Sequence, residues 1–484
     1  MSVLMRLGTG FTTVLLLAAC SSGGSSGGGG PATLVEACEA HTDIDGVNRV
    51  AIAMSSSVSA NNGNACQELH QYNLFAPNED EGFLRGDPRR PLVVEGEYQG
   101  LPYVLNTALF SDYTAKHRIV FLPRDENGDF IPATYRDAGS EPDGTPGTGD
   151  LPKANDNFLF PVGTVIAKTF TYPDASAPGG AVERVIETRL LIKHTNTGDG
   201  SERWEGVAYF WERDETTDEW IAYRLNRGTQ VGDDIGVFDE ERNWHYPDPN
   251  DPDLTISGTA AEGEDLYLIP SRDNCLTCHS NADQDAGAAP IGLKARYLNR
   301  PYASEFDTFT NDPVDLVDSN QIDYWAAQGW LSDVEPQAYT LDTQTGVITD
   351  IERIQPYNIP GDDTDPEADL AARARGYLEV NCAHCHNEMR RISPTGVPSA
   401  GVEDFYLEFQ RAFCSQNFFD QGNIAPGDAE GSDLYKRINT PGDEQVNAGG
   451  GDPMPRLARQ LIHAEGVAVI GAWIDNMPTD ICEP

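Results

Sequence analysis

The chain has 484 residues, of which 77 are acidic and 33 are basic, so its formal net charge is −44. Such an excess of acidic groups would repel a phosphate backbone, which excludes nucleic acid as a partner. The length is sufficient for two or three domains, each with a hydrophobic core.

Residues 1–19 are predicted to be a signal peptide. Arg6 precedes an apolar run over residues 11–19, which has the length of a signal-peptide core and is too short to span a bilayer. The run ends in Leu-Ala-Ala-Cys20 and resembles the bacterial lipoprotein signal box, which implies that Cys20 is lipidated and begins the mature protein. The alternative is an ordinary cleavable signal with an incidental cysteine.

Residues 20–33 are predicted to be a flexible tether, because positions 21–30 contain only Ser and Gly. The residue after Cys20 is not Asp, and by resemblance to enterobacterial sorting rules this favours the outer membrane. The protein is therefore expected to be exported and anchored to the membrane through its lipid, at the periplasmic face or at the cell surface.

Four further cysteines lie outside the motifs discussed below, and an exported protein keeps disulfides. Three pairings exist, and sequence proximity favours Cys38 with Cys66 and Cys414 with Cys482. Free buried thiols are the alternative.

Residues 34–270 are predicted to form a β-rich domain that begins with a small cystine-closed segment, 34–66. Short apolar or alternating runs recur between Gly- and Pro-containing turns, as expected for a sandwich or barrel. The runs are residues 92–94, 118–122, 164–170, 182–192, 206–211 and 219–223. Residues 125–150 are expected to be an exposed loop.

Two Cys-x-x-Cys-His motifs follow, at residues 275–279 and 382–386, and this pattern is the attachment signature of c-type haem. The two cysteines of each motif can reach the vinyl groups of one porphyrin, and the histidine can ligate its iron. Two covalently bound haem c groups are therefore predicted. A redox dithiol or half a zinc site would fit a single motif. The predicted attachment and proximal residues are Cys275, Cys278, His279, Cys382, Cys385 and His386.

Residues 271–360 are assigned to a first haem-binding module with its linker, and residues 361–484 to a second module. Helical apolar spacing is present over residues 369–381, directly before the second motif, and again over 466–477. With the Met454-Pro455 element, these features resemble a class I cytochrome c domain. The resemblance implies that His386 is the proximal ligand of the second haem and Met454 its distal ligand, whereas an incidental core methionine is the alternative.

The distal ligand of the first haem is less specified. His117, His194, His245 and Lys294 are candidates, and an open coordination position is a further alternative. His384 is expected to face away from the iron towards solvent, and His463 to be a surface or capping group.

Residues 109–118, 160–170, 274–279 and 298–299, within a pattern that extends from about residue 70 to the end, resemble a family of uncharacterised bacterial dihaem c-type lipoproteins. The resemblance implies an exported haem protein and ranks His117 first among the distal candidates. It transfers no reaction.

The sequence thus predicts a multidomain α+β protein, with an N-terminal β-rich domain followed by mainly α-helical cytochrome c-type haem modules. Electron transfer to redox partner proteins is the expected function, and no catalytic residue is assigned. A peroxidase-like dihaem oxidoreductase with an open first haem is the alternative. A polymer-binding β-domain that carries a cytochrome, with a contact surface of Trp204, Trp211, Trp220 and Trp244, is a second. The acidity is interpreted first as a solvated surface, and steering of a basic redox partner or weak Ca²⁺ capture is the alternative.

Overall fold

The structure is a computed structural model. It describes residues 66–76, 84–94, 97–125, 127–135, 158–173, 183–195, 202–214, 216–224, 235–237, 242–248, 251–260, 267–269, 278–279, 290–302, 319–332, 341–342, 347–349, 351–358, 365–387, 405–409, 414, 419, 422–442, 452–456 and 459–481. Within residues 235–260, and at residues 94, 97, 173 and 268, only the backbone is described. The predicted signal peptide, Cys20 and the tether lie outside these residues. None of the helices described has the length and apolar content that crossing a bilayer requires.

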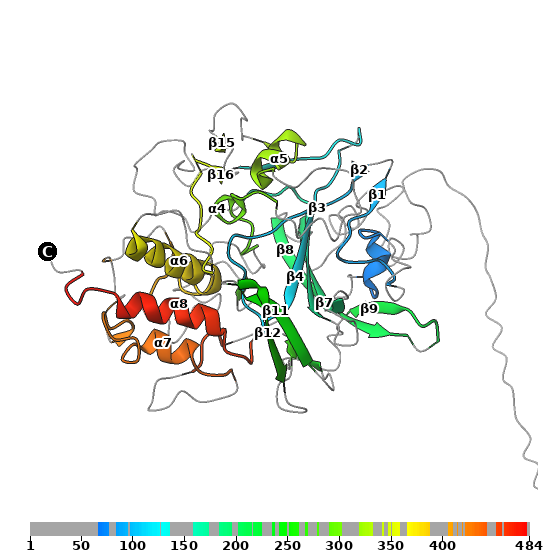
Figure 1. Ribbon diagram of the computed structural model, residues 1–484. Helices are drawn as coiled ribbons and strands as arrows, with labels where there is room; N and C mark the ends of the chain where they lie inside the picture. Colours follow the sequence, from blue (N-terminus) through cyan, green and yellow to red (C-terminus); the bar gives the residue numbers. More distant parts are fainter. Residues whose placement is uncertain are drawn as a thin grey trace, which may run out of the picture.

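Six antiparallel strands form the main sheet, in the spatial order β3, β4, β6, β7, β8, β9 (Figure 1). Their bounds are Leu101–Pro102, Ala115–Phe121, Val165–Pro173, Glu183–Thr195, Glu202–Arg213 and Trp220–Arg224. Strands β4 and β6 to β9 coincide with five of the predicted runs, and the sixth run contains β1, so the β-rich prediction is confirmed. Among the described strands β3 and β9 are the edges of this sheet, so the sheet that these strands form is open.

The remaining described strands form two-stranded pairs. They are β1 (Val93–Val94) with β2 (Glu97–Tyr98), β5 (Ala133–Thr134) with β14 (Leu331–Ser332), β10 (Ile235–Val237) with β13 (Tyr267–Ile269), β11 (Arg242–Asp248) with β12 (Asp251–Ala260), and β15 (Leu341–Asp342) with β16 (Val347–Ile348). Strand β5 lies inside the segment predicted to be an exposed loop, and its Ala133 is buried because it pairs with Leu331 and joins a core.

The pleat of the main sheet divides its apolar residues between two cores. On β4, Ile119 and Phe121 join one cluster with the short 3-10 helix Leu69–Tyr72, whereas Val120 and Leu122 join the other. This alternation is the period of two that an antiparallel strand imposes. Of the proposed tryptophan contact surface, Trp204 and Trp211 are buried in these cores, Trp220 packs partly buried against one of them, and the side chain of Trp244 lies outside the described residues.

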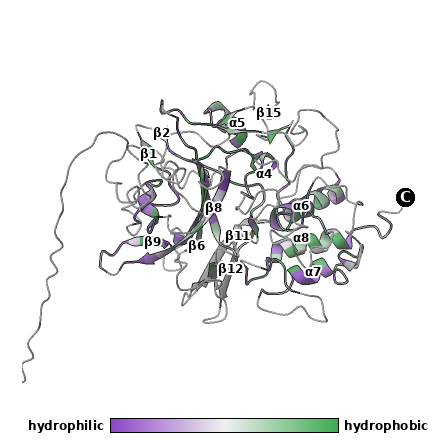
Figure 2. Cartoon of the chain, turned by 180° about the vertical axis from the view of Figure 1, so that it is seen from behind, coloured by the Kyte–Doolittle hydropathy of each residue, from purple (hydrophilic) through white to green (hydrophobic). Residues whose placement is uncertain are grey.

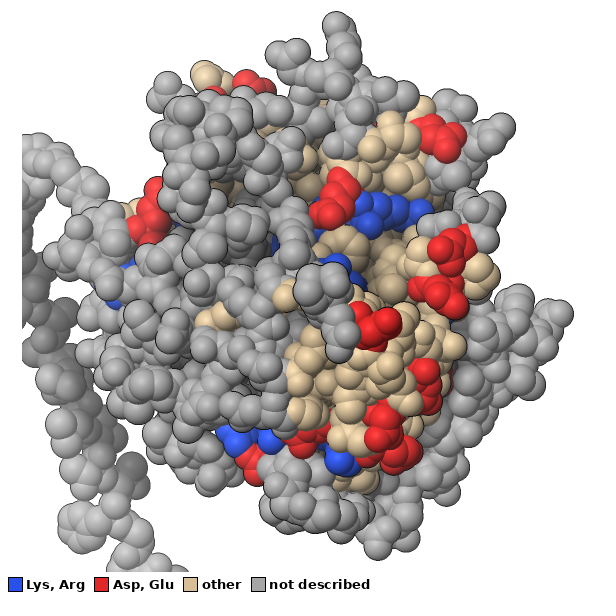
Figure 3. All heavy atoms as spheres, turned by 90° about the vertical axis from the view of Figure 1, so that its left-hand side faces the viewer, with Lys and Arg blue, Asp and Glu red and all other residues tan. Residues whose placement is uncertain are grey.

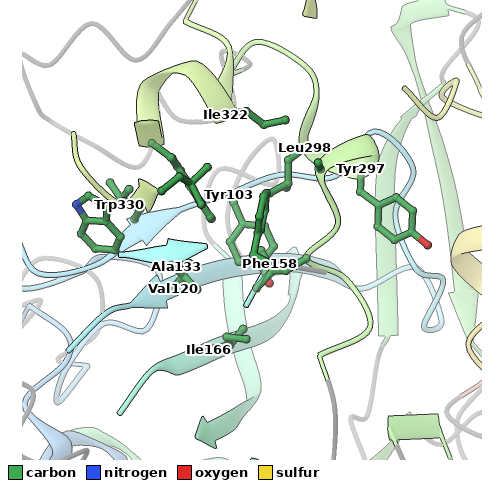
Figure 4. Close-up of a cluster of buried hydrophobic side chains, with 14 of the residues drawn as sticks. Tyr103, Val120, Ala133, Phe158, Ile166, Tyr297, Leu298, Ile322 and Trp330 are labelled. Carbon is green, nitrogen blue, oxygen red and sulfur yellow. The ribbon is translucent and has the colours of Figure 1, made fainter. Parts of the chain in front are cut away.

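The core around Val120 also contains residues from beyond position 270 (Figure 4). Tyr297 and Leu298 of α4 (Ala295–Leu298) and Ile322 of α5 (Gln321–Ala327) lie with Tyr103 and Val120 in it. The predicted domain division at residue 270 is therefore not a division between cores, because the segment after it completes the core of the sheet.

The described part of residues 361–484 contains three helices and no strand. They are α6 (Pro366–Asn381), α7 (Asp433–Ile438) and α8 (Ala464–Asp475), beside the sheet in Figure 1. Most of α8 is apolar (Figure 2), and it packs on α6. Their approach is close at Gly466, where a Cβ atom would lie 2.5 Å from the Tyr377 ring. The helices predicted at 369–381 and 466–477 are confirmed.

Candidate functional site

The second Cys-x-x-Cys-His motif begins where α6 ends. Asp365 caps the start of this helix by accepting hydrogen bonds from the amides of Glu367 and Ala368. Cys382 is the C-terminal cap, and its carbonyl oxygen accepts hydrogen bonds from the amides of Cys385 at 3.0 Å and His386 at 2.8 Å. This turn keeps the two cysteines on one loop of backbone, as the spacing predicted.

His386 is held by a backbone carbonyl. Its Nδ1 lies 3.2 Å from the carbonyl oxygen of Phe405, and the amide of Leu407 donates to the His386 carbonyl. Burial lowers the pKa of His386, so its imidazole is neutral. A neutral ring that donates Nδ1–H to a carbonyl presents Nε2 as its ligand atom, which is the usual arrangement of a metal-ligating histidine.

Cys382 and Met454 both lie at the apolar core of the helical module. Burial, and next the neighbouring Cys385, raise the pKa of the Cys382 thiol to about 12. Met454 is fixed in the backbone by an amide hydrogen bond to the carbonyl oxygen of Arg437, 3.0 Å long. The structure therefore brings the predicted distal residue into the cluster that contains the second motif.

The two motifs meet in space. The Sγ atoms of Cys278 and Cys385 and a ring nitrogen of His384 lie within 4.8 Å of one another, although 106 positions separate Cys278 from His384. Nδ1 of His384 is buried and has no hydrogen-bond partner among the residues described. The expectation that His384 faces solvent is wrong, because the first motif packs beside it. Cys275 lies outside the described residues, and His279 is in the same helical turn as Cys278.

A buried carboxylate joins the segments that carry the two motifs. Glu379, three positions before Cys382, accepts hydrogen bonds at Oε1 from Lys294 (2.8 Å), Arg296 (2.7 Å) and Tyr297 (2.8 Å). Its Oε2 accepts from the amide of Phe409 at 2.9 Å. The proposal that Lys294 ligates iron is corrected here, because its ammonium is buried against Glu379.

The ionisation state of Glu379 follows from its pairing with Lys294 and Arg296. Burial of Glu379 opposes its charge, but the adjacent Lys294 and Arg296 outweigh burial and hold the pKa of Glu379 well below its ordinary value. The sequence does contain a signal that could have identified Glu379. It is the single acidic side chain in the apolar run directly before the second motif.

The histidine candidates for the first haem are in different settings. Nε2 of His117, on β4, lies 2.6 Å from Glu183 Oε2, so the atom that would ligate iron contacts a carboxylate. His194, on β7, is buried, and its Nδ1 has no hydrogen-bond partner within the described part of the chain. The side chain of His245, on β11, lies outside the described residues. The distal ligand of the first haem stays a prediction.

His463 is the N-cap residue of α8, as one of the two expectations had it, but its side chain makes no capping hydrogen bond and is buried and not at the surface. Its Nδ1 lies 3.0 Å from the Tyr377 hydroxyl, its Nε2 lies 3.1 Å from the Tyr357 hydroxyl, and its ring stacks on Phe110 at 4.3 Å. Burial, and then Lys116 and Arg459, lower the pKa of His463 to about 3. A neutral imidazole thus connects α6 to the segment that leads into β4.

Cys66 and Cys414 are both disulfide-bonded, and the predicted partners, Cys38 and Cys482, lie outside the described residues. The Sγ atom of Cys414 is 3.6 Å from the carbonyl oxygen of Ile481, the neighbour of Cys482 in sequence. This contact favours the second predicted pair, and both pairings stay predictions. Cys278, Cys382 and Cys385 are thiols.

Comparison with known proteins gives no assignment: no family model, curated protein or solved structure matches this chain.

Replacing Glu379 with Gln is expected to destabilise the protein by about 3–5 kcal/mol, because it leaves Lys294 and Arg296 buried without their counter-charge. Since the folded-state pKa of Glu379 is lowered, its stabilisation is present above the ordinary pKa near 4.5 and is lost as pH falls towards the folded-state value. Acidification should therefore destabilise wild type more than Glu379→Gln in urea titrations. Glu367→Gln, exposed on the same helix, should change stability by less than about 0.5 kcal/mol.

Proposed function

We propose that this protein is an exported, lipid-anchored dihaem c-type cytochrome that transfers electrons. The observation that carries the proposal is the setting of His386: it completes a Cys-x-x-Cys-His sequence at the end of α6 and contacts the Phe405 carbonyl through Nδ1. This leaves Nε2 as the available donor, as a proximal haem ligand requires.

The residues present fit a haem at the second motif. Cys382 and Cys385 supply two sulfurs on one turn, and His386 supplies a neutral imidazole. Met454 supplies a thioether from a distant part of the sequence, and it lies at the same apolar cluster. When bound, the group would supply a one-electron ferric–ferrous couple, and a thioether opposite imidazole favours the ferrous form.

The contact between the motifs supports a coupled pair. Groups attached through Cys278 and Cys385 would be neighbours, because these sulfurs lie within 4.8 Å of each other. Neighbouring redox groups suit relay of electrons through the protein. The described face that carries α6 to α8 has more acidic than basic side chains (Figure 3), which fits a basic redox partner.

Export in a host with haem-attachment machinery is expected to give protein whose denatured mass exceeds the mature polypeptide by two haems. Cys382→Ala/Cys385→Ala and Cys275→Ala/Cys278→Ala should each carry one, because each motif attaches its own group. Intact mass and the pyridine haemochrome spectrum measure this. Wild-type protein with the bare polypeptide mass would refute the proposal.

Met454→Leu should abolish the ferric thioether charge-transfer band and lower the reduction potential by about 59 mV for each tenfold loss of preference for the ferrous state. Met477→Leu is the matched control, because Met477 is also buried in this apolar cluster but follows the end of α8. It should retain the band. Loss of the band in Met477→Leu and its retention in Met454→Leu would reverse the ligand assignment.

A second function is favoured by the surroundings of His384: one of its ring nitrogens lies within 4.8 Å of two cysteine sulfurs, and its buried Nδ1 has no hydrogen-bond partner among the described residues. Two sulfurs and one imidazole are a donor set for zinc or another soft transition metal, with a fourth ligand to complete a tetrahedron. Under this alternative the protein holds a metal across the two motifs in place of haem.

His384→Ala separates the two functions. A haem protein should retain both haems, because His384 is not an attachment or proximal residue. A zinc protein should lose stoichiometric metal, with affinity for added Zn²⁺ falling by more than the roughly 10–100-fold that loss of an outer-shell partner of a ligand costs, because His384 would be a direct ligand. Metal analysis and Zn²⁺ titration of the full chain measure this, with His70→Ala on the short 3-10 helix as the control.

A further inference from the structure

Three basic side chains lie side by side across three strands of the main sheet. Arg118 on β4 is opposite Lys168 on β6, and Lys168 is opposite Arg189 on β7. Lys116 is two residues before Arg118, so it lies on the same face of the sheet. In a chain with 77 acidic and 33 basic residues, three basic groups in register and a fourth on the same face are not a consequence of composition.

One aromatic ring lies beneath these groups. Phe170 follows Lys168 by two positions and is fully buried. Its ring centre is 4.9 Å from Lys168 Nζ, 5.7 Å from Lys116 Nζ and 4.4 Å from Arg189 Cζ. The ring thus gathers three cations on one side of the sheet, but it carries no charge to neutralise them.

The nearby carboxylates are already engaged. Glu187 accepts hydrogen bonds from Arg189 and from the Tyr267 hydroxyl. Oδ1 of Asp112 accepts from the amides of Gln460 and Leu461. Among the described residues neither Lys116 nor Lys168 is paired with a carboxylate, and the ammonium of Lys116 donates only to the Thr114 carbonyl.

The arrangement of these four basic side chains disfavours their charged forms. Like charges directly opposite on neighbouring strands are destabilising. Burial, and next Arg118, hold the pKa of both Lys116 and Lys168 well below the ordinary value. A bound anion would remove both penalties, since it would replace lost hydration and screen the repulsion.

We infer that Lys116, Arg118 and Lys168, above the Phe170 ring and beside Arg189, form a binding site for an oxyanion. Ammonium groups act on such a ligand as point charges, and a guanidinium adds directional hydrogen bonds to its oxygens. The ligand chemistry is a carboxylate or a phosphate-like oxyanion. It has two sources: a free anion, or a carboxylate of a haem held by this protein, and the second source rests on the proposed function.

Inorganic phosphate is the probe, compared with chloride at matched ionic strength so that general screening is held constant. Phosphate at about ten times its Kd should raise the melting temperature of the full chain by about 1–2 °C. Lys168→Met should weaken phosphate binding, measured by calorimetry, about tenfold or more. It should also raise the melting temperature without phosphate, because one uncompensated charge is gone. Lys436→Met, exposed on α7, should do neither.

Haem loading distinguishes the sources. If a haem carboxylate fills the site, loaded wild type should not respond to phosphate, whereas Cys275→Ala/Cys278→Ala should respond through Lys168. If the ligand is a free anion, both proteins should respond. The inference would be overturned if neither the loaded wild type nor Cys275→Ala/Cys278→Ala showed a Lys168-dependent response to phosphate. A lower melting temperature of Lys168→Met than of wild type without phosphate would also overturn it. A chain that carries no haem still reports phosphate binding, so the failure of the proposed function is recognised separately.

Discussion

The hydrogen bonds and ion pairs of the buried Glu379 carboxylate are the interaction on which the candidate site depends. Glu379 lies on α6 one turn before Cys382, and its hydrogen bonds reach Lys294, Arg296 and Tyr297 in the segment that follows the first motif. A charge removed from water in this way is stable only while its partners stay in place. The ion cluster therefore holds together two positions that are 85 residues apart in the sequence.

The same connection explains why the molecule does not divide into a sheet domain and separate helical modules at residue 270. The segment after the first motif contributes Tyr297, Leu298 and Ile322 to the core that begins at Val120 on the sheet. From the other side, Phe110 and Tyr113 reach the helices, where Phe110 stacks on His463 and the Tyr113 hydroxyl lies 3.0 Å from Glu465. The helical module that carries the second motif is thus in contact with the segment that leads into the sheet.

Local structure could be predicted well from this sequence, and contacts between distant segments could not. Alternating apolar residues gave β4, β6 and β7, and helical spacing gave α6 and α8, because these patterns record which face of an element is buried. The positions of His384, His463 and Lys294 depend on what packs beside them, and no local pattern contains that information. His384 was expected to face solvent because its position between the two cysteines would turn it away from the iron, whereas Cys278 of the first motif lies beside it. Glu379 was detectable in principle, since a single carboxylate in an apolar run must have a buried partner.

Two clusters of basic side chains in this protein differ in how far carboxylates neutralise their charge. Lys294 and Arg296 converge on Glu379, and although burial opposes its charge, that carboxylate raises the pKa of Lys294. Lys116 and Lys168 are half-buried beside Arg118, and loss of hydration lowers their pKa because the described carboxylates nearby, Asp112 and Glu187, offset it only in part. A chain with so many acidic residues could have placed one opposite Lys168, yet the cross-strand neighbours there are Arg118 and Arg189. The sheet thus has basic groups at a position where their charge destabilises the fold. Binding of a negatively charged ligand would make that charge stabilising.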